Sequence, residues 1–133
     1  MKIVQAVGKR KSAIARVTLK QGKGRIRVNH VLLDNYEPRL SRLKLKEPLL
    51  LAGDVVSKVD IDVNVSGGGI ASQAEASRLG VAKGLVEFTK NEKLREQFLN
   101  YDRNLLVADV RRKETHKPNR HGKARAKRQK SYR

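Results

Sequence analysis

Hydrophobic and polar residues alternate along much of the chain, and this period of two is typical of strands that bury one face. The alternation is clearest in Val55–Val65, where Val59, Ile61, Val63 and Val65 are separated by Asp60, Asp62 and Asn64. Ala13–Leu19 and Arg25–Val28 show the same period, and Ile3–Val7 is a further short β-type run. These segments predict a sheet with one hydrophobic face.

Polar segments rich in glycine and lysine separate the predicted strands. We expect turns at Gly8–Lys11, Lys20–Gly24 and Asn29–His30, because glycine and asparagine tolerate the backbone angles of tight turns. The first turn carries three consecutive cations, Lys9, Arg10 and Lys11. They form either a solubilising hairpin tip or a contact to phosphate.

A helical period begins at Arg39. Leu40, Leu43 and Leu50 can share one face of this predicted helix. Pro48 lacks the N–H that a helix interior needs, so we expect it to break or restart the helix.

Two further helices are predicted in the second half of the chain. One runs from Ile70 to about Lys90, and its apolar face holds Ile70, Ala74, Val81, Leu85 and Phe88. The other runs from Glu92 to about Asn100, with Asn91 as its cap and Leu94, Phe98 and Leu99 as its apolar contacts. Leu105–Ala108 is expected to be a strand or a buried extended piece. Together the patterns predict one α+β domain over residues 1–110.

Three features of this domain could carry chemistry. Asp60 and Asp62 share a strand face and form either an acid/base or metal pair or a solvated surface; no His, Ser or third carboxylate accompanies them. Gly67–Gly69 form either a phosphate cradle or a tight turn that brings backbones together. Arg78 lies at the edge of an apolar helix face, so its guanidinium lies either in water or on an RNA phosphate.

The charge of the chain narrows the class of partner. It has 31 Lys or Arg against 13 Asp or Glu, a net charge of +18. Eleven of the cations and only one acid, Glu114, fall in residues 111–133, which contain no Leu, Ile, Val, Met or Phe. This basic tail cannot bury a core, so we expect it to become ordered only against a strongly anionic partner. A nucleic acid is the partner that best fits this charge. An anionic membrane surface is the alternative, but membrane binding favours Trp or Phe beside the cations, and the tail has neither.

Other functions find less support in the sequence. The absence of cysteine excludes disulfides and thiolate metal sites, and His30 has no companion at ligand spacing. We expect no metal, no cofactor and no enzymatic activity. The first residues lack the apolar run of a signal peptide, and no segment has the length of a membrane span, so we expect a cytoplasmic protein. A DNA-compacting protein and an RNA-cleaving enzyme that uses Asp60 and Asp62 are the alternatives.

Three segments resemble the family of the universal ninth protein of the small ribosomal subunit. They are GKRKSAIARV at 8–17, SGGGIASQAEASRLGVAKGL at 66–85 and KARAKRQKSYR at 123–133. The ending QKSYR is similar to the archaeal and eukaryotic branch, and the short amino terminus to the archaeal one. The resemblance implies a mostly antiparallel sheet with helices on one face and a left-handed βαβ crossover.

The resemblance also implies partners and contact residues. The domain would bind rRNA in the head of the small subunit, in the 3′ major domain, beside neighbouring head proteins. The tail would reach the anticodon stem-loop of the peptidyl-site tRNA. The residues expected to contact rRNA are Gly8, Lys9, Arg10, Lys11, Lys20, Lys23, Gly67, Gly68, Gly69, Arg78, Arg111, Arg112, Lys113, Lys117, Arg120, Lys123, Arg125, Lys127 and Arg128. The tRNA-proximal residues would be Lys130, Ser131, Tyr132 and Arg133.

Overall fold

The computed structural model describes residues 2–118 and 124. Its strands are β1 (Ile3–Arg10), β2 (Ala13–Gln21), β3 (Ile26–Val28), β4 (Val31–Leu32) and β5 (Val59–Ser66). Its α-helices are α1 (Arg39–Ala52), α2 (Ile70–Thr89) and α3 (Glu92–Tyr101). Three short 3-10 helices, η1 (Leu33–Asn35), η2 (Gly53–Lys58) and η3 (Arg103–Leu105), connect them. The predicted α+β class is confirmed.

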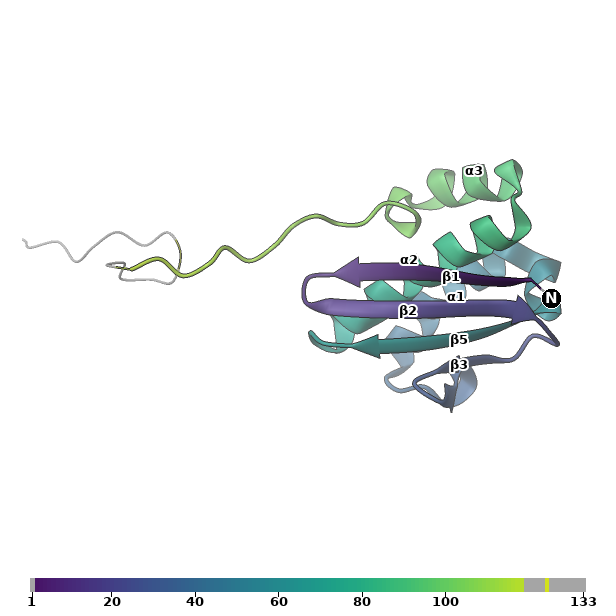
Figure 1. The fold of residues 1–133 in the computed structure, drawn as a ribbon, viewed down its shortest axis with the longest axis horizontal. Helices are drawn as coiled ribbons and strands as arrows, with labels where there is room; N and C mark the ends of the chain where they lie inside the picture. Colours follow the sequence, from purple (N-terminus) through teal and green to yellow (C-terminus); the bar gives the residue numbers. More distant parts are fainter. Residues whose placement is uncertain (1, 119–123, 125–133) are drawn as a thin grey trace, which may run out of the picture.

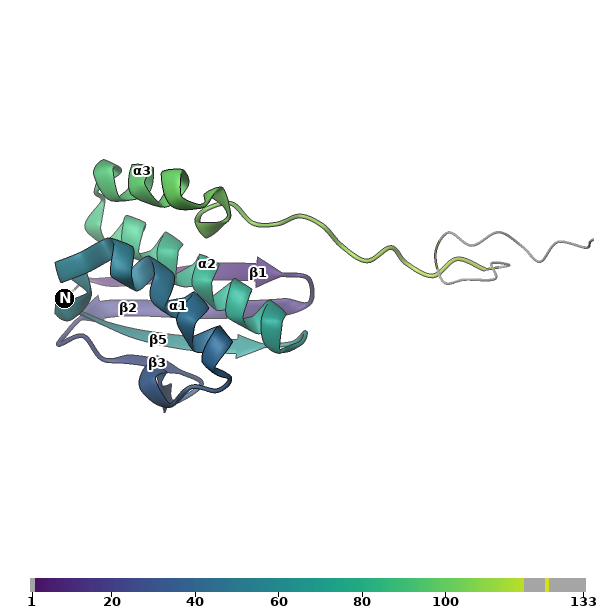
Figure 2. The same ribbon diagram turned by 180° about the vertical axis from the view of Figure 1, so that it is seen from behind.

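The five strands form one sheet in the order β1-β2-β5-β3-β4, and only the β3–β5 pair is parallel. Helices α1 and α2 cover one face of it (Figure 1, Figure 2). In Figure 2 the path from β3 to β5 passes through α1 in front of the sheet, while β5 points right and lies above β3. That geometry is a left-handed crossover, as the resemblance implied, and is the opposite of the usual hand.

The core lies between this covered face and α2. The predicted alternation is confirmed in β2 and β5, whose inward residues are Ala13, Ala15, Val17, Leu19, Val59, Ile61, Val63 and Val65. Ala74, Val81 and Leu85 of α2 meet them as predicted, whereas Ile70 is exposed. The opposite face of the sheet is open, as antiparallel sheets allow.

The first turn lies later than predicted. β1 continues through Gly8 to Arg10, and the chain turns at Lys11 and Ser12, with Lys11 at φ 54°. Gly8 therefore serves close packing instead of the turn: a Cβ there would lie 1.9 Å from the carbonyl oxygen of Ala76 in α2. The turn predicted at Lys20–Gly24 is confirmed at 22–24, since β2 continues to Gln21, and the turn at Asn29–His30 is confirmed.

The prediction for α1 is wrong in two respects. The helix continues through Pro48, which is fully buried, so its packing against the core overrides the local preference. Leu40, Leu43 and Leu50 are exposed. Ser41, Leu45 and Pro48 form the buried face in their place, because amphipathic helices can carry apolar residues outside the core face.

Two boundaries in the second half also differ. Val55–Lys58 belong to η2, so β5 starts only at Val59. Leu105–Ala108 are not a strand: Leu105 ends η3 with its side chain fully buried, and irregular chain follows. α2 and α3 begin where predicted, and the Asn91 side chain accepts the Lys93 N–H as the predicted cap.

Gly8→Ala tests the close approach of β1 and α2. The new methyl group would collide with backbone atoms, which cannot rotate away, so we expect a loss of about 1–3 kcal/mol or more in the free energy of unfolding. Gly69→Ala is the matched control, since nothing lies within 4 Å of its Cβ position and its φ is −101°. Urea unfolding measures both. Equal losses would show that the contact at Gly8 is not tight.

Candidate nucleic-acid interface

Several predicted contact groups lie together at one end of the sheet. A depression of about 600 Å³ there is lined by Arg10, Lys11, Ser12, Arg111, Arg112 and Lys113. We call these six residues the tail-end surface, because the basic tail leaves the domain from here (Figure 1). The guanidinium of Arg112 donates a hydrogen bond to the carbonyl of Lys11, which joins the start of the tail to the β1–β2 turn.

The glycine loop borders the tail-end surface. Gly67 and Gly68 adopt φ values of 80° and 64°, which side chains other than glycine rarely tolerate. A Cβ at Gly67 would lie 2.4 Å from the Ser12 carbonyl oxygen. The loop ends at the start of α2, where the cap Gly69 supplies no side-chain acceptor and the first turn has no acidic residue. The first N–H groups of the helix can therefore attract an anion.

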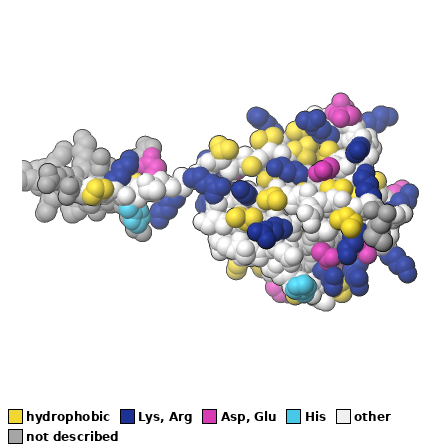
Figure 3. Space-filling model, viewed as in Figure 1, with side chains coloured by type: hydrophobic (Ala, Val, Ile, Leu, Met, Phe, Trp, Pro, Cys, Tyr) yellow, Lys and Arg dark blue, Asp and Glu magenta, His cyan; other side chains and the backbone are white. Residues whose placement is uncertain are grey.

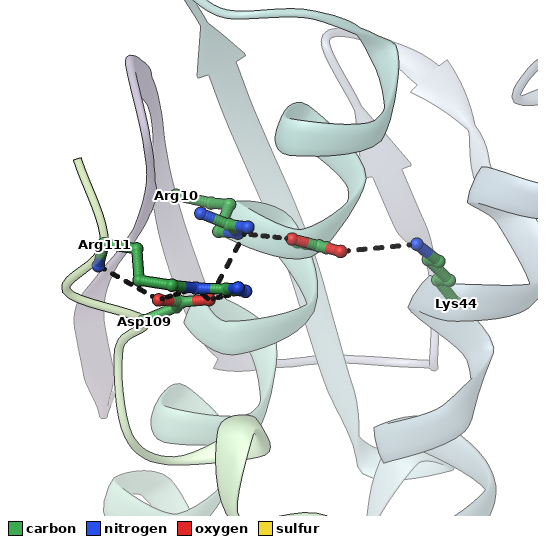
Figure 4. Close-up of polar contacts among 5 residues, drawn as sticks. Arg10, Lys44, Asp109 and Arg111 are labelled. Atoms are coloured by element: carbon green, nitrogen blue, oxygen red, sulfur yellow. Dashed lines mark hydrogen bonds and ion pairs between the residues drawn. The ribbon is translucent and has the colours of Figure 1, made fainter. Parts of the chain in front are cut away.

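Four residues hold the base of the tail, and we call them the tail clasp: Arg10, Glu75, Asp109 and Arg111. Arg10 Nε binds Glu75 Oε2 at 2.7 Å, and Arg10 Nη2 lies 3.5 Å from Asp109 Oδ2. Arg111 donates both its backbone N–H and its guanidinium to Asp109, at 3.0 Å and 2.7 Å. Figure 4 shows the side chains of both arginines against Asp109, and Lys44 of α1 reaching the Glu75 carboxylate. β1, α2 and the tail are thus tied by charge-assisted bonds.

The clasp shifts the ionisation of its members. The hydrogen bonds from Arg111, and then the charge of Arg10, hold the pKa of Asp109 far below its usual range. In turn, the hydrogen bond to Asp109 raises the pKa of Arg111. Because the pKa of Asp109 is lowered by folding, its contribution to stability is present above about pH 3.9 and is lost as the pH falls below that value.

Arg78 does not hold its guanidinium in water, as one of the two alternatives from the sequence had it. Its side chain is only 13% exposed, and its guanidinium lies 2.6 Å from the Glu47 carboxylate and 3.0 Å from that of Asp102. Burial raises the pKa of Asp102, but the hydrogen bonds from the Asn104 N–H and from Arg78 outweigh it, so that pKa is lowered. Arg78 thus links α1, α2 and the start of η3. An RNA contact by Arg78 stays a prediction.

The two strand carboxylates have structural partners. Asp60 accepts the backbone N–H groups of Lys23 and Arg25, and these bonds lower its pKa. Asp62 pairs with Arg27 at 2.9 Å. In the part of the chain that the structure describes, no group of three or more His, Asp or Glu could hold a metal ion. Because it binds the Lys23 and Arg25 N–H groups, Asp60 orders the β2–β3 loop.

The remaining predicted contacts are spread more widely. Lys20 and Lys23 lie at the other end of the sheet, separated from the tail-end surface by the eight residues of β5, or roughly 25 Å. Figure 3 shows lysine and arginine side chains around the margin of the open sheet face and along the described part of the tail. Lys9 is exposed on β1 and Lys117 on the tail.

The other predicted tail contacts lie outside the described residues. They are Arg120, Lys123, Arg125, Lys127, Arg128, Lys130, Ser131, Tyr132 and Arg133. Sequence reasoning missed the carboxylates of the clasp. Glu75 lies 65 positions from Arg10, so no local pattern connects them, whereas the spacing of Asp109 and Arg111 was a usable signal.

A basic α+β domain with an open sheet face and a cationic tail is typical of structural nucleic-acid-binding proteins. Among residues 2–118 and 124, no helix has the length and hydrophobicity to cross a membrane. The profile of the family described as ribosomal protein S9/S16 matches residues 8–133. The chain is 54% identical to the small ribosomal subunit protein uS9 of Methanococcus maripaludis strain C7, over all of both chains. It is 51% identical, again over all of both chains, to that of Methanococcus vannielii.

The chain belongs to the ribosomal protein S9/S16 family. It is accordingly a structural protein of the small ribosomal subunit, in the cytoplasmic ribosome, and not an enzyme. The archaeal-type ending agrees with its Methanococcus relatives.

Arg111→Ala tests the clasp. Removal of the main hydrogen-bond donor should raise the pKa of Asp109 toward about 3.9. An NMR titration of the Asp109 side-chain carboxyl carbon between pH 1.5 and 6 measures this change. Arg112→Ala is the control, because Arg112 bonds to Lys11 and not to Asp109. A pKa of Asp109 that is equal in the two variants would contradict the clasp.

Proposed function

We propose that the chain binds rRNA in the head of the small subunit, in the 3′ major domain, and that its tail reaches the anticodon stem-loop of the peptidyl-site tRNA. The observation that carries the proposal is the convergence of the β1–β2 turn, the loop Gly67–Gly69 and the start of the tail at one end of the sheet. These three segments are far apart in the sequence. Their meeting creates a continuous surface suited to an RNA backbone.

The charges of this surface are divided between two tasks. Arg10 is 14% exposed and is bound to Glu75 and Asp109. Lys11 and Lys113 are exposed and form no ion pair with a described residue. The half-buried Arg10 therefore fixes the geometry, while the two lysines supply charge for phosphate neutralisation.

The glycine loop and the tail complete the proposed interface. Because the glycines at Gly67–Gly69 have no side chains, a phosphate can approach the N–H groups at the start of α2. The clasp holds Arg111 against the domain, so the tail starts from a fixed point. Extended chain spans at most about 3.3–3.6 Å per residue, which gives the twenty-three tail residues a reach of roughly 75 Å toward the tRNA. The predicted rRNA contacts at Lys9, Lys20, Lys23 and Arg78 and along residues 113–128 belong to the same proposal.

Lys11→Gln with Lys113→Gln tests the rRNA contact. We expect weaker binding to 3′-domain rRNA and a salt slope of log K that is shallower by about 1.4–1.8, at 0.7–0.9 for each lost phosphate contact. Filter binding or fluorescence anisotropy across a salt series measures the slope.

Lys90→Gln with Lys93→Gln is the matched control. Lys90 has a left-handed φ of 52°, close to the 54° of Lys11. It is the C-cap of α2, and Lys93 lies in the first turn of α3, so both control residues are away from the tail. An equal loss of slope in the two double variants would mean that the tail-end surface is not the binding site.

Deletion of residues 130–133 tests the tRNA contact. It removes two cations, so we expect the affinity of reconstituted subunits for peptidyl-site tRNA to fall roughly tenfold, or about 1.4 kcal/mol. Subunit assembly, followed by sedimentation, should not change. Unchanged tRNA affinity in assembled subunits would remove the tRNA role and leave the rRNA role intact.

A further inference from the structure

A groove lies at the end of the sheet opposite the tail-end surface. Its volume is about 680 Å³, and it runs between the second half of α1, the β3–β4 hairpin and η2. Its apolar lining consists of Ile26, Leu32, Leu33, Leu49, Leu50 and Val56. We call it the α1 groove. Lys23 at its edge is one of the predicted rRNA contacts, and the other lining residues belong to none of the contact sites proposed above.

An exposed leucine lies on each side of the α1 groove. Leu50 of α1 is 79% exposed and Leu32 of β4 is 46% exposed, and both line the groove. Single exposed leucines are common on protein surfaces. Two leucines on opposite lips of an apolar groove make a continuous patch, and such patches mark surfaces that another molecule covers.

The rim of the α1 groove is cationic. Lys23, Arg25 and Lys46 line it together with one carboxylate, Asp34. The Asp34 carboxylate lies 3.8 Å from the Lys46 ammonium, so its negative charge offsets the charge of that lysine alone. Asp60 accepts the backbone N–H of Arg25, and its charge also attracts the Arg25 guanidinium; the Arg25 side chain is exposed at the rim. The groove thus combines an apolar floor with an excess of positive charge.

These two properties select one kind of occupant. The tail of this chain and a second copy of it are both strongly cationic, so the rim repels them. A nucleic acid supplies phosphate for the rim but no aliphatic side chain for the floor. We infer that the α1 groove binds an acidic segment of a neighbouring protein that inserts a large apolar side chain between Leu32 and Leu50.

The two ends of the domain would then bind different classes of macromolecule. The tail-end surface presents lysines without an apolar floor, whereas the α1 groove presents leucines under a cationic rim. The inference goes beyond the rRNA and tRNA contacts proposed above and does not depend on which nucleotides they involve.

A photo-crosslinker tests the inference. The full chain with p-benzoyl-phenylalanine in place of Leu50 is assembled into small subunits, irradiated and analysed by mass spectrometry. We expect a cross-link to a protein segment that has more acidic than basic residues. The same crosslinker in place of Leu40 is the matched control, because Leu40 is also exposed on α1, at 67%, but does not line the groove. The Leu50 yield should exceed the Leu40 yield at least fivefold for that segment.

Charge reversal completes the test. Arg25→Glu should lower the Leu50 cross-link to that segment at least fivefold, whereas Lys93→Glu should not change it. Cross-links from Leu50 to rRNA, to this chain's own tail or to a basic segment would overturn the inference, and so would a yield no higher than from Leu40. The salt series on the Lys11 and Lys113 variants tests the proposed rRNA function separately. The groove inference and the rRNA function can therefore fail independently.

Discussion

The architecture depends on the close contact between the backbones of β1 and α2. At Gly8 and Gly80 no side chain separates strand from helix: a Cβ at Gly8 would lie 2.6 Å from the Gly80 nitrogen and still nearer to the Ala76 carbonyl oxygen. This approach determines which residues meet further along. Arg10 lies two residues after Gly8, and Glu75 directly precedes Ala76, so the contact brings the guanidinium and the carboxylate together. The start of α2 is brought beside the β1–β2 turn for the same reason.

Part of the positive charge of the domain is divided by side-chain type, although Lys44 and Lys46 also pair with carboxylates. Arg10, Arg27 and Arg78 each bind a carboxylate in the structure, and Arg111 binds Asp109. The planar guanidinium suits such fixed pairs, whereas the lysine ammonium is more strongly hydrated. The few acids of a basic chain are thus used to position arginines, and exposed lysines such as Lys11 and Lys113 retain their charge for a partner. Net charge alone could not reveal this division.

The sequence predicted the elements well where one local pattern decides them. The alternation of Val59 to Val65 and the Asn91 cap lead directly to β5 and α3. The prediction from sequence failed where one residue type serves two structural purposes. Glycine permits turns and also close packing, so Gly8 suggested a turn although the strand continues through it. Likewise Pro48 suggested a break, but burial against the core outweighs its local cost. The partners of Arg78 come from α1 and from the residue before η3, and only the tertiary fold brings them together.

The exposed leucines of α1 follow from the same competition between local and global signals. In a helix that packs on one side against α2, the buried stripe at Ser41, Leu45 and Pro48 is narrow and contains a polar and a cyclic residue. The stronger apolar residue, Leu50, faces outward beside Leu32. Leu50 lies outside the core, which includes Leu45 as the contribution of α1. An exposed leucine is informative about binding when it shares an apolar groove with a second one, as Leu50 does with Leu32, and the position of this groove opposite the tail separates the two proposed binding faces of the domain.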